Sequence, residues 1–220
     1  MKAWIEDDNI NYEYIIRYIR DTIPQCEGQL REMELFAKEN EVPISQPESI
    51  RMIEVLLKMM GAKKILEIGS AIGYSAIRMS RATGAEVVTV ELLDSMADIA
   101  EQNFKEAGLT DKITLIRGDG AEVVSRMDGE GIFDAIFVDA AKGQYMEVFP
   151  HCDRLLRKGG ILISDNILYK GMTATDELVV RRKITIVRRL RAYLEMLKKN
   201  PDFSTSIIPI GDGVALSFKE

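Results

Sequence analysis

The chain has 220 residues, of which 46% are hydrophobic and 29% charged, and this is enough for one complete core. A formal net charge of −6, taken alone, argues against nucleic-acid binding. Two cysteines exclude a disulfide framework, and the single histidine has no partner spaced for a zinc site or a serine-type triad. No run of 18 apolar residues occurs, and the start of the chain is acidic, unlike a signal peptide. We therefore expect one domain over residues 1–220, in the cytoplasm and without membrane attachment.

The first 60 residues have helical patterns. Tyrosine and isoleucine recur at helical spacing over residues 14–19, and a second helical segment is expected over about 25–40. A third begins near Pro47, because proline and an early acid mark helix starts, and it ends at Gly61.

From residue 61 onward, short apolar runs alternate with helical patterns of about 10 to 15 residues. The expected strands are 64–68, 86–90, 113–116, 133–138 and 160–164. The last part, 205–218, has two apolar runs joined by a Gly-Asp-Gly turn, which predicts an antiparallel hairpin. The chain is therefore expected to be an α/β protein with a doubly wound, mostly parallel seven-stranded sheet, an antiparallel last strand and N-terminal helices.

A glycine loop follows the first expected strand. Gly69 and Gly73 belong to it, and Glu91 ends the next strand 22 positions after Gly69, where an acid can accept hydrogen bonds from both hydroxyls of a ribose. The spacing is not that of a dinucleotide loop, and Glu67 precedes the turn. A carboxylate there would repel a pyrophosphate but suits a cationic ligand such as S-adenosylmethionine. A turn without a ligand is the alternative.

The third expected strand is followed by Gly118-Asp119-Gly120-Ala121. Asp119 is an acid at the same sheet edge as Glu67 and Glu91, so it is placed to hold the adenine amino group. A role as the N-cap of the next helix is equally open.

Polar side chains also follow the fourth and fifth strands. Asp139 and Lys142 come after one, and Asp165 and Asn166 after the other. Two carboxylates and an amide oxygen suit a hard cation such as Mg²⁺, and no thiolate or imidazole is near except His151 and Cys152. Lys142 would be the base that deprotonates an acceptor hydroxyl, or else a solvated surface lysine.

Four segments, taken together, resemble the cation-dependent O-methyltransferases of the catechol and caffeoyl-CoA type over residues 42–218. They are 66–75, 139–145, 165–171 and 209–216. The resemblance implies the class I S-adenosylmethionine methyltransferase fold, a metal held by Asp139, Asp165 and Asn166, and catalysis by Lys142 and Asp139. It also implies cofactor contacts from Val42, Glu67, Gly69, Ser75, Glu91, Asp119, Gly120, Ala121 and Asp139.

Within that family the chain is most similar to bacterial enzymes that methylate 5-hydroxyuridine at the tRNA wobble position. The likeness lies in Val42-Pro-Ile44, in 71–79 and in the arginines of 181–191. It implies a tRNA anticodon partner. Related enzymes are commonly homodimers. A bulky aromatic precedes the lysine in the catechol enzymes, whereas this chain has Ala140 and Ala141, which makes a free catechol a poorer candidate.

The charge distribution bears on the substrate. Residues 181–199 carry a net +7, which leaves −13 for the rest. On a helical wheel one face holds five cations, opposite an apolar face; they are Arg181, Arg182, Arg188, Arg189 and Lys199. The first four are our candidates for RNA phosphate binding, although a solvated face is the commoner meaning of such a run. A small catechol or caffeoyl-CoA-like phenol is the alternative substrate. A non-catalytic RNA protein that binds S-adenosylmethionine, or an NAD-binding oxidoreductase, is a third reading.

Overall fold

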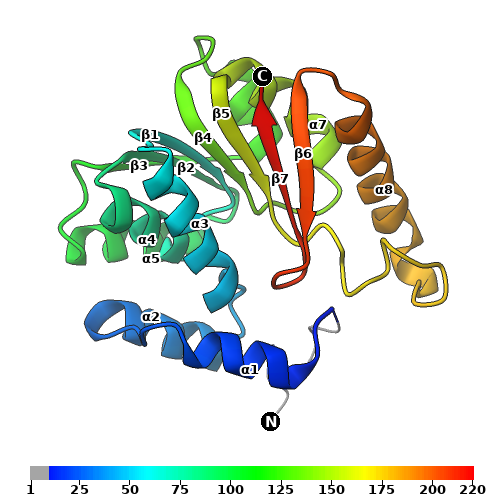
Figure 1. Cartoon of the computed structure of the whole chain (residues 1–220). Helices are drawn as coiled ribbons and strands as arrows, with labels where there is room; N and C mark the ends of the chain where they lie inside the picture. Colours follow the sequence, from blue (N-terminus) through cyan, green and yellow to red (C-terminus); the bar gives the residue numbers. More distant parts are fainter. Residues whose placement is uncertain (1–9) are drawn as a thin grey trace.

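The computed structural model describes residues 10–220, and the acidic start of the chain lies outside them. A seven-stranded sheet forms the centre, with helices packed on both of its faces (Figure 1). The expected fold class is confirmed.

The sheet has the strand order β3-β2-β1-β4-β5-β7-β6. Parallel pairing joins β3, β2, β1, β4 and β5, while β7 pairs antiparallel with both β5 and β6. The strands are β1 Lys64–Ile68, β2 Glu86–Glu91, β3 Ile113–Arg117, β4 Phe133–Val138, β5 Leu156–Ser164, β6 Phe203–Ile208 and β7 Val214–Lys219. The hairpin expected at the end of the chain is therefore the β6–β7 pair.

Alternation along the strands places apolar side chains on both faces of the sheet. One buried cluster joins the sheet to α3, α4 and α5, and the other joins it to α6, α7 and α8. The helices are α1 Glu13–Asp21, α2 Gly28–Glu39, α3 Pro47–Met59, α4 Tyr74–Thr83, α5 Asp94–Glu106, α6 Gly120–Arg126, α7 Tyr145–Leu155 and α8 Ile184–Lys199. Since both faces of the central parallel strands are covered, β1 and β4 have nearly continuous apolar sequences.

Most expected elements agree with the structure within a few residues, and two differ. The fifth strand begins at Leu156, four residues earlier than expected, because its first residues pair with β4 across an irregularity in the register. The basic segment is not one continuous α-helix: Arg181–Lys183 form a short 3₁₀ turn, η2, before α8 starts at Ile184. A single helical wheel over 181–199 was therefore the wrong geometry for the first arginines.

The N-terminal helices lie along the edge of the molecule where the β6–β7 turn is found (Figure 1). Helix α1 has no buried residue. Polar contacts help to hold this region: Arg20 makes hydrogen bonds of 2.7 and 2.8 Å to Glu48 of α3, and Asn11 donates one of 2.6 Å to the carbonyl oxygen of Pro209. Within residues 10–220, every helix is too short or too polar to cross a membrane.

Candidate active site

The carboxyl ends of the parallel strands bring the predicted site residues to one edge of the sheet. Ile68 pairs with Val138, and Val138 pairs with Ser164. The next residues continue this register, because the Asp139 amide donates to the Ile68 carbonyl at 2.9 Å and the Asp165 amide to the Val138 carbonyl at 3.0 Å. The glycine loop, the first acid and the second acid therefore follow three adjacent strands, where ligands bind in open α/β sheets.

A cavity of about 570 Å³ opens at this edge. Six of the nine predicted cofactor residues line it, namely Val42, Gly69, Glu91, Asp119, Gly120 and Asp139. The structure adds lining residues that the sequence analysis did not select: the apolar Leu92, Leu93 and Met96 after the acid of β2, and Gln144 from the loop before α7. The available signal for them was that they follow Glu91 or Lys142 within a few positions of the sequence.

Two glycines that line this cavity lie in close contact with other parts of the chain. Gly69 has φ +105°, and a side chain there would place its Cβ 2.3 Å from the main-chain oxygen of Asp139. At Gly120 a Cβ would lie 2.6 Å from Ile68. The cofactor loop therefore passes directly against the backbone of the predicted metal ligand, which only glycine permits.

Glu91 points both carboxylate oxygens at main-chain amides beside the cavity. It accepts hydrogen bonds from the Ala71 amide at 2.8 Å and from the Leu93 amide at 2.9 Å. These bonds fix the orientation of the carboxylate, and each oxygen retains further acceptor capacity. Its predicted contact with two ribose hydroxyls is compatible with this arrangement.

Glu67 and Ser75 lie together, but behind the cavity wall. Ser75 and Thr89 each donate a 2.5 Å hydrogen bond to the Glu67 carboxyl group, and Glu67 is fully buried. Burial raises the pKa of Glu67 to about 7, although the two hydrogen bonds favour its charged form. Neither residue lines the cavity, nor does the predicted contact Ala121. Direct cofactor contact by these three stays a prediction.

Asp119 is the N-cap of α6. Its Oδ1 accepts from the amides of Ala121 at 3.0 Å and Glu122 at 3.2 Å. Its Oδ2 accepts from the Gln144 side chain at 2.7 Å. The capping role considered from sequence is thus present, and the residue lines the cavity as well. The adenine contact stays a prediction.

The two predicted metal ligands Asp139 and Asp165 are close enough to affect each other's charge. Burial raises the pKa of Asp165 well above its ordinary value, and Asp139 raises it further. Burial also raises the pKa of Asp139, against the lowering effect of Lys142. Asp165 is buried and Asp139 is half-buried, and two such carboxylates that repel each other favour a bound cation. The Tyr145 hydroxyl donates to the Asp165 carbonyl at 2.6 Å and holds this turn in place.

Lys142 completes the group. Its ammonium donates a 3.1 Å hydrogen bond to Oδ1 of Asn166, and it lies 5.6 Å from the centroid of the Tyr169 ring. The alternative of a solvated surface lysine does not describe this partly buried position. Among residues 10–220 no three His, Cys, Asp or Glu side chains gather as a metal cluster. The predicted ligand set is of a different kind, since one of its three members is an amide.

The four predicted RNA-binding arginines, at positions 181, 182, 188 and 189, are exposed. None of them makes a hydrogen bond or ion pair within the described part of the chain. Neighbouring cations differ. Arg191 binds Asp176 and the carbonyls of Met172 and Thr173, and Lys199, which shared the predicted face, pairs with Glu195 at 3.0 Å.

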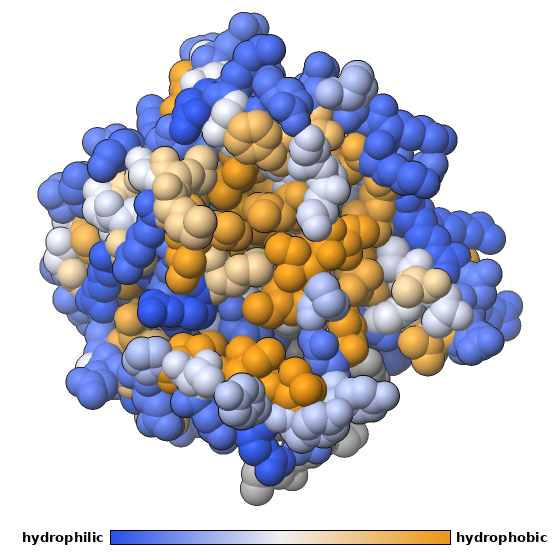
Figure 2. Space-filling view, in the orientation of Figure 1, coloured by the Kyte–Doolittle hydropathy of each residue, from blue (hydrophilic) through white to orange (hydrophobic). Residues whose placement is uncertain are grey.

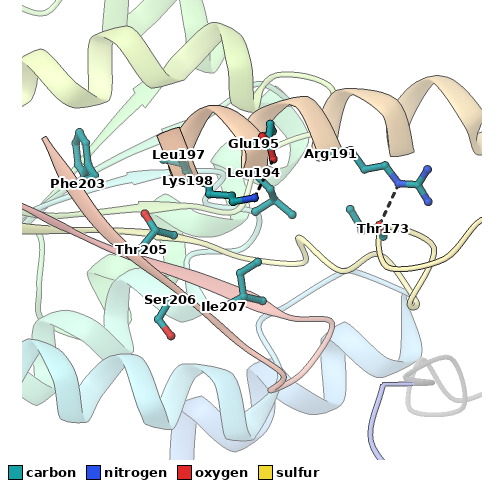
Figure 3. Close-up of a pocket in the computed structure, with 10 residues that line it drawn as sticks. All are labelled: Thr173, Arg191, Leu194, Glu195, Leu197, Lys198, Phe203, Thr205, Ser206 and Ile207. Atoms are coloured by element: carbon teal, nitrogen blue, oxygen red, sulfur yellow. Dashed lines mark hydrogen bonds and ion pairs between the residues drawn. The ribbon is translucent and has the colours of Figure 1, made fainter. Parts of the chain in front are cut away.

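A second cavity, of about 650 Å³, lies between α8 and β6 (Figure 3). It is lined by apolar residues such as Leu194 and Phe203, and by two cations. Arg191 donates a hydrogen bond to the carbonyl oxygen of Thr173, and Lys198 forms an ion pair with Glu195. Of the described residues around it, none was predicted for cofactor, metal or RNA binding. It is therefore separate from the candidate site.

Comparison with known proteins identifies the family to which this chain belongs. Residues 21–220 match the O-methyltransferase family. The chain belongs to that family. It is 33% identical to a catechol O-methyltransferase of Niastella koreensis over 152 residues, which cover 67% of this chain and 68% of that one. These matches confirm the family that the sequence motifs indicated.

Solved structures agree in fold. A Staphylococcus aureus protein described as a candidate caffeoyl-CoA O-methyltransferase superposes with a TM-score of 0.87 at 32% identity, covering 94% of this chain and 100% of that one. An O-methyltransferase from Bacillus cereus, solved with SAH, gives a TM-score of 0.81 at 27% identity, covering 98% and 100%. The protein is therefore an S-adenosylmethionine-dependent O-methyltransferase of the caffeoyl-CoA and catechol type.

Proposed function

We propose that this O-methyltransferase transfers the methyl group of S-adenosylmethionine to the 5-hydroxyl of 5-hydroxyuridine at the tRNA wobble position, giving 5-methoxyuridine. The observation that carries the proposal is the unpaired arginine group of η2 and α8, because it reaches the proposed catalytic loop. A Cβ added to Gly143, the residue after Lys142, would lie 2.9 Å from Nη1 of Arg189. Phosphates bound by these arginines would flank the reacting base.

The cavity supplies the cofactor half of the reaction. Its acid Glu91 suits the ribose, and Asp119 with Gln144 suits the adenine end. The sulfonium donor needs no activation, so the residues have to place the acceptor in line with the methyl carbon. Lys142 is the proposed base, since its ammonium group lies at the same sheet edge as the acidic pair and is held by Asn166.

Asp139, Asp165 and Asn166 are the proposed ligands of a divalent cation such as Mg²⁺. The buried carboxylate of Asp165, the half-buried one of Asp139 and an amide oxygen are hard oxygen donors that suit such an ion. A cation bound there would act as a Lewis acid that favours the ionised form of the acceptor hydroxyl. 5-Hydroxyuracil offers the vicinal oxygens such a site needs, in its 5-hydroxyl and 4-carbonyl groups.

The same chemistry on a small catechol or a caffeoyl-CoA-like phenol is the second candidate. The names of the relatives favour it. Ala140 and Ala141 make a free catechol a poorer candidate, because both line the cofactor cavity and neither supplies an aromatic side chain on which a catechol ring could stack. A CoA thioester would bring phosphates of its own to the arginines.

We further propose that the protein acts as a homodimer. Apolar side chains gather over α3 and the strands beside it, on the side of the sheet that no helix covers over β6 and β7 (Figure 2). Met59 is 80% exposed, and Val55 and Phe218 are also exposed. Patches of this kind mark contact surfaces on soluble proteins. Light scattering should give twice the 24.8 kDa chain mass, and Met59→Lys should lower it; a wild-type monomer at micromolar concentration would refute the dimer.

The experiment that tests the function is nucleoside analysis of tRNA from cells with and without the gene. Loss of 5-methoxyuridine and accumulation of 5-hydroxyuridine are expected without it, and both should be reversed by the wild-type gene but not by an Asp165→Ala version. An unchanged nucleoside profile would refute the RNA substrate and leave the phenol candidate.

A further inference from the structure

Lys183 lies beside the catalytic centre, although it sits 41 positions after Lys142 in the chain. Its ammonium is 5.6 Å from the centroid of the Tyr169 ring, the same distance as the ammonium of Lys142 from that ring. Tyr169 is 7% exposed and belongs to the loop that follows Asp165 and Asn166. One tyrosine therefore holds two cations, the proposed base and the last residue of η2.

The ammonium of Lys183 is positioned but has no anionic partner. It makes no hydrogen bond or ion pair within residues 10–220. At the C-terminal end of α8, by contrast, Lys198 and Lys199 are both paired with Glu195. A cation–π contact fixes the direction of an ammonium and leaves its three donors free. An anion would satisfy them.

Arg189 approaches the same loop from α8. Its guanidinium lies where a side chain on Gly143 would have to be, with Nη1 2.9 Å from the position of the missing Cβ. The two cations thus lie near Lys142 through different contacts. Lys183 shares the Tyr169 ring with Lys142, and Arg189 lies against Gly143, the residue after Lys142. No described carboxylate neutralises either of them.

We propose that Lys183 and Arg189 form a phosphate-binding pair beside the active site, which holds a phosphate of the substrate while the acceptor hydroxyl faces Lys142. Guanidinium groups bind phosphate through two parallel hydrogen bonds, and an ammonium adds a compact charge. The phosphate belongs to the backbone of an RNA or to a CoA thioester. The proposal rests on the proposed methyl transfer for its reaction, and on the two contacts above for its place.

The test compares substrates that carry phosphates with phosphate-free counterparts that have the same acceptor hydroxyl. One pair is an RNA stem-loop containing 5-hydroxyuridine and the free 5-hydroxyuridine nucleoside; the other is a phenolic acyl-CoA and its free acid. Variants are Lys183→Ala, Lys183→Arg and Arg189→Ala, with Lys198→Ala at the far end of α8 as the control. Thermal melting of each variant checks that it is folded.

For the phosphate-bearing substrate, Lys183→Ala and Arg189→Ala should each raise KM about ten- to a hundredfold, as expected for a lost charge-assisted hydrogen bond, and leave kcat within about twofold. The phosphate-free member should be converted with unchanged constants. Lys183→Arg should raise KM only slightly, and Lys198→Ala should leave KM unchanged. An equal loss on both members of a pair would show that Lys183 only supports Tyr169, and would overturn the proposal.

The outcomes separate this inference from the proposed RNA substrate. If wild type ignores the RNA but converts the acyl-CoA with a KM that depends on Lys183, the RNA function fails and the phosphate pair stands. If wild type methylates the RNA and Lys183→Ala has an unchanged KM, the pair fails and the function stands. Wild-type activity on phosphate-free substrates alone would overturn both.

Discussion

The side-chain amide of Gln144 donates a 2.7 Å hydrogen bond to Oδ2 of Asp119. The bond joins two parts of the site that are separate in sequence, the loop that carries Lys142 and the N-cap of α6 at the cofactor cavity. Removing it with Gln144→Ala should weaken cofactor binding by about 1 kcal/mol, the typical net contribution of one hydrogen bond, while the cap bonds of Oδ1 remain. Titration calorimetry with SAH measures this, and an unchanged affinity would remove Gln144 from the cofactor site.

Glu91→Ala should weaken cofactor affinity by about 1 to 3 kcal/mol, the cost of a lost charge-assisted hydrogen bond. Divalent-cation affinity should change little, because Glu91 lies on β2 and the proposed ligands follow β4 and β5. Calorimetry with each ligand separates the two effects. Glu86→Ala, at the exposed start of the same strand, is the matched control.

Asp165→Ala should abolish methyl transfer while the folded protein still binds SAH, because the cofactor cavity is not lined by Asp165. A chelator should cause the same loss in wild type, reversed by added Mg²⁺. Full activity of metal-free enzyme would refute the proposed cation site.

Glu67 predicts a pH dependence of folding. Its pKa is raised from 4.5 to about 7, so the folded state binds this proton more tightly than the unfolded state does. Stability from this group is therefore fully present below pH 4.5 and falls as the pH rises to about 7, by up to roughly 3 kcal/mol. Glu67→Gln, which cannot ionise, should gain thermal stability relative to wild type between pH 5 and pH 8 in cofactor-free protein. If the melting temperatures of the two proteins differed by the same amount at every pH, the raised pKa of Glu67 would be contradicted.

Lys142→Met should lower kcat far more than it raises KM, and the pH–rate profile should lose the limb that reports the base. The hydrogen bond from Lys142 to Asn166 is lost as well, and thermal melting of the variant checks that the loop is still folded. A Lys142→Met enzyme with the wild-type rate at every pH would show that another group accepts the proton.

The sequence was sufficient to predict those features of the site that depend on a residue's position along a strand. Asp139 and Asp165 each follow a buried apolar run, and parallel register alone brings such positions together. Contacts that depend on how two segments pack against each other could not be predicted from the sequence. Nothing in the chain shows that Lys183 shares a ring with Lys142, or that Gln144 meets Asp119.

Glu67 and Ser75 illustrate the same limit. Their motif was recognised, but the side chains bind each other behind the cavity wall, a direction that strand alternation permits and the motif does not specify. The 3₁₀ turn at Arg181–Lys183 was missed because charge periodicity is similar over one turn of either helix type.

The central claim is that the free arginines of η2 and α8 bind RNA phosphates, and the salt dependence of methylation tests it most directly. Initial rates on a 5-hydroxyuridine stem-loop would be measured from low to moderate salt for wild type, for Arg182→Glu with Arg188→Glu, and for a control of equal charge change, Lys38→Glu with Lys105→Glu. The arginine variant should lose most of its activity and show a flatter salt dependence, since each lost phosphate contact removes about one released counterion, while the control follows wild type. Wild-type rates and salt dependence in the arginine variant would contradict RNA recognition by this surface.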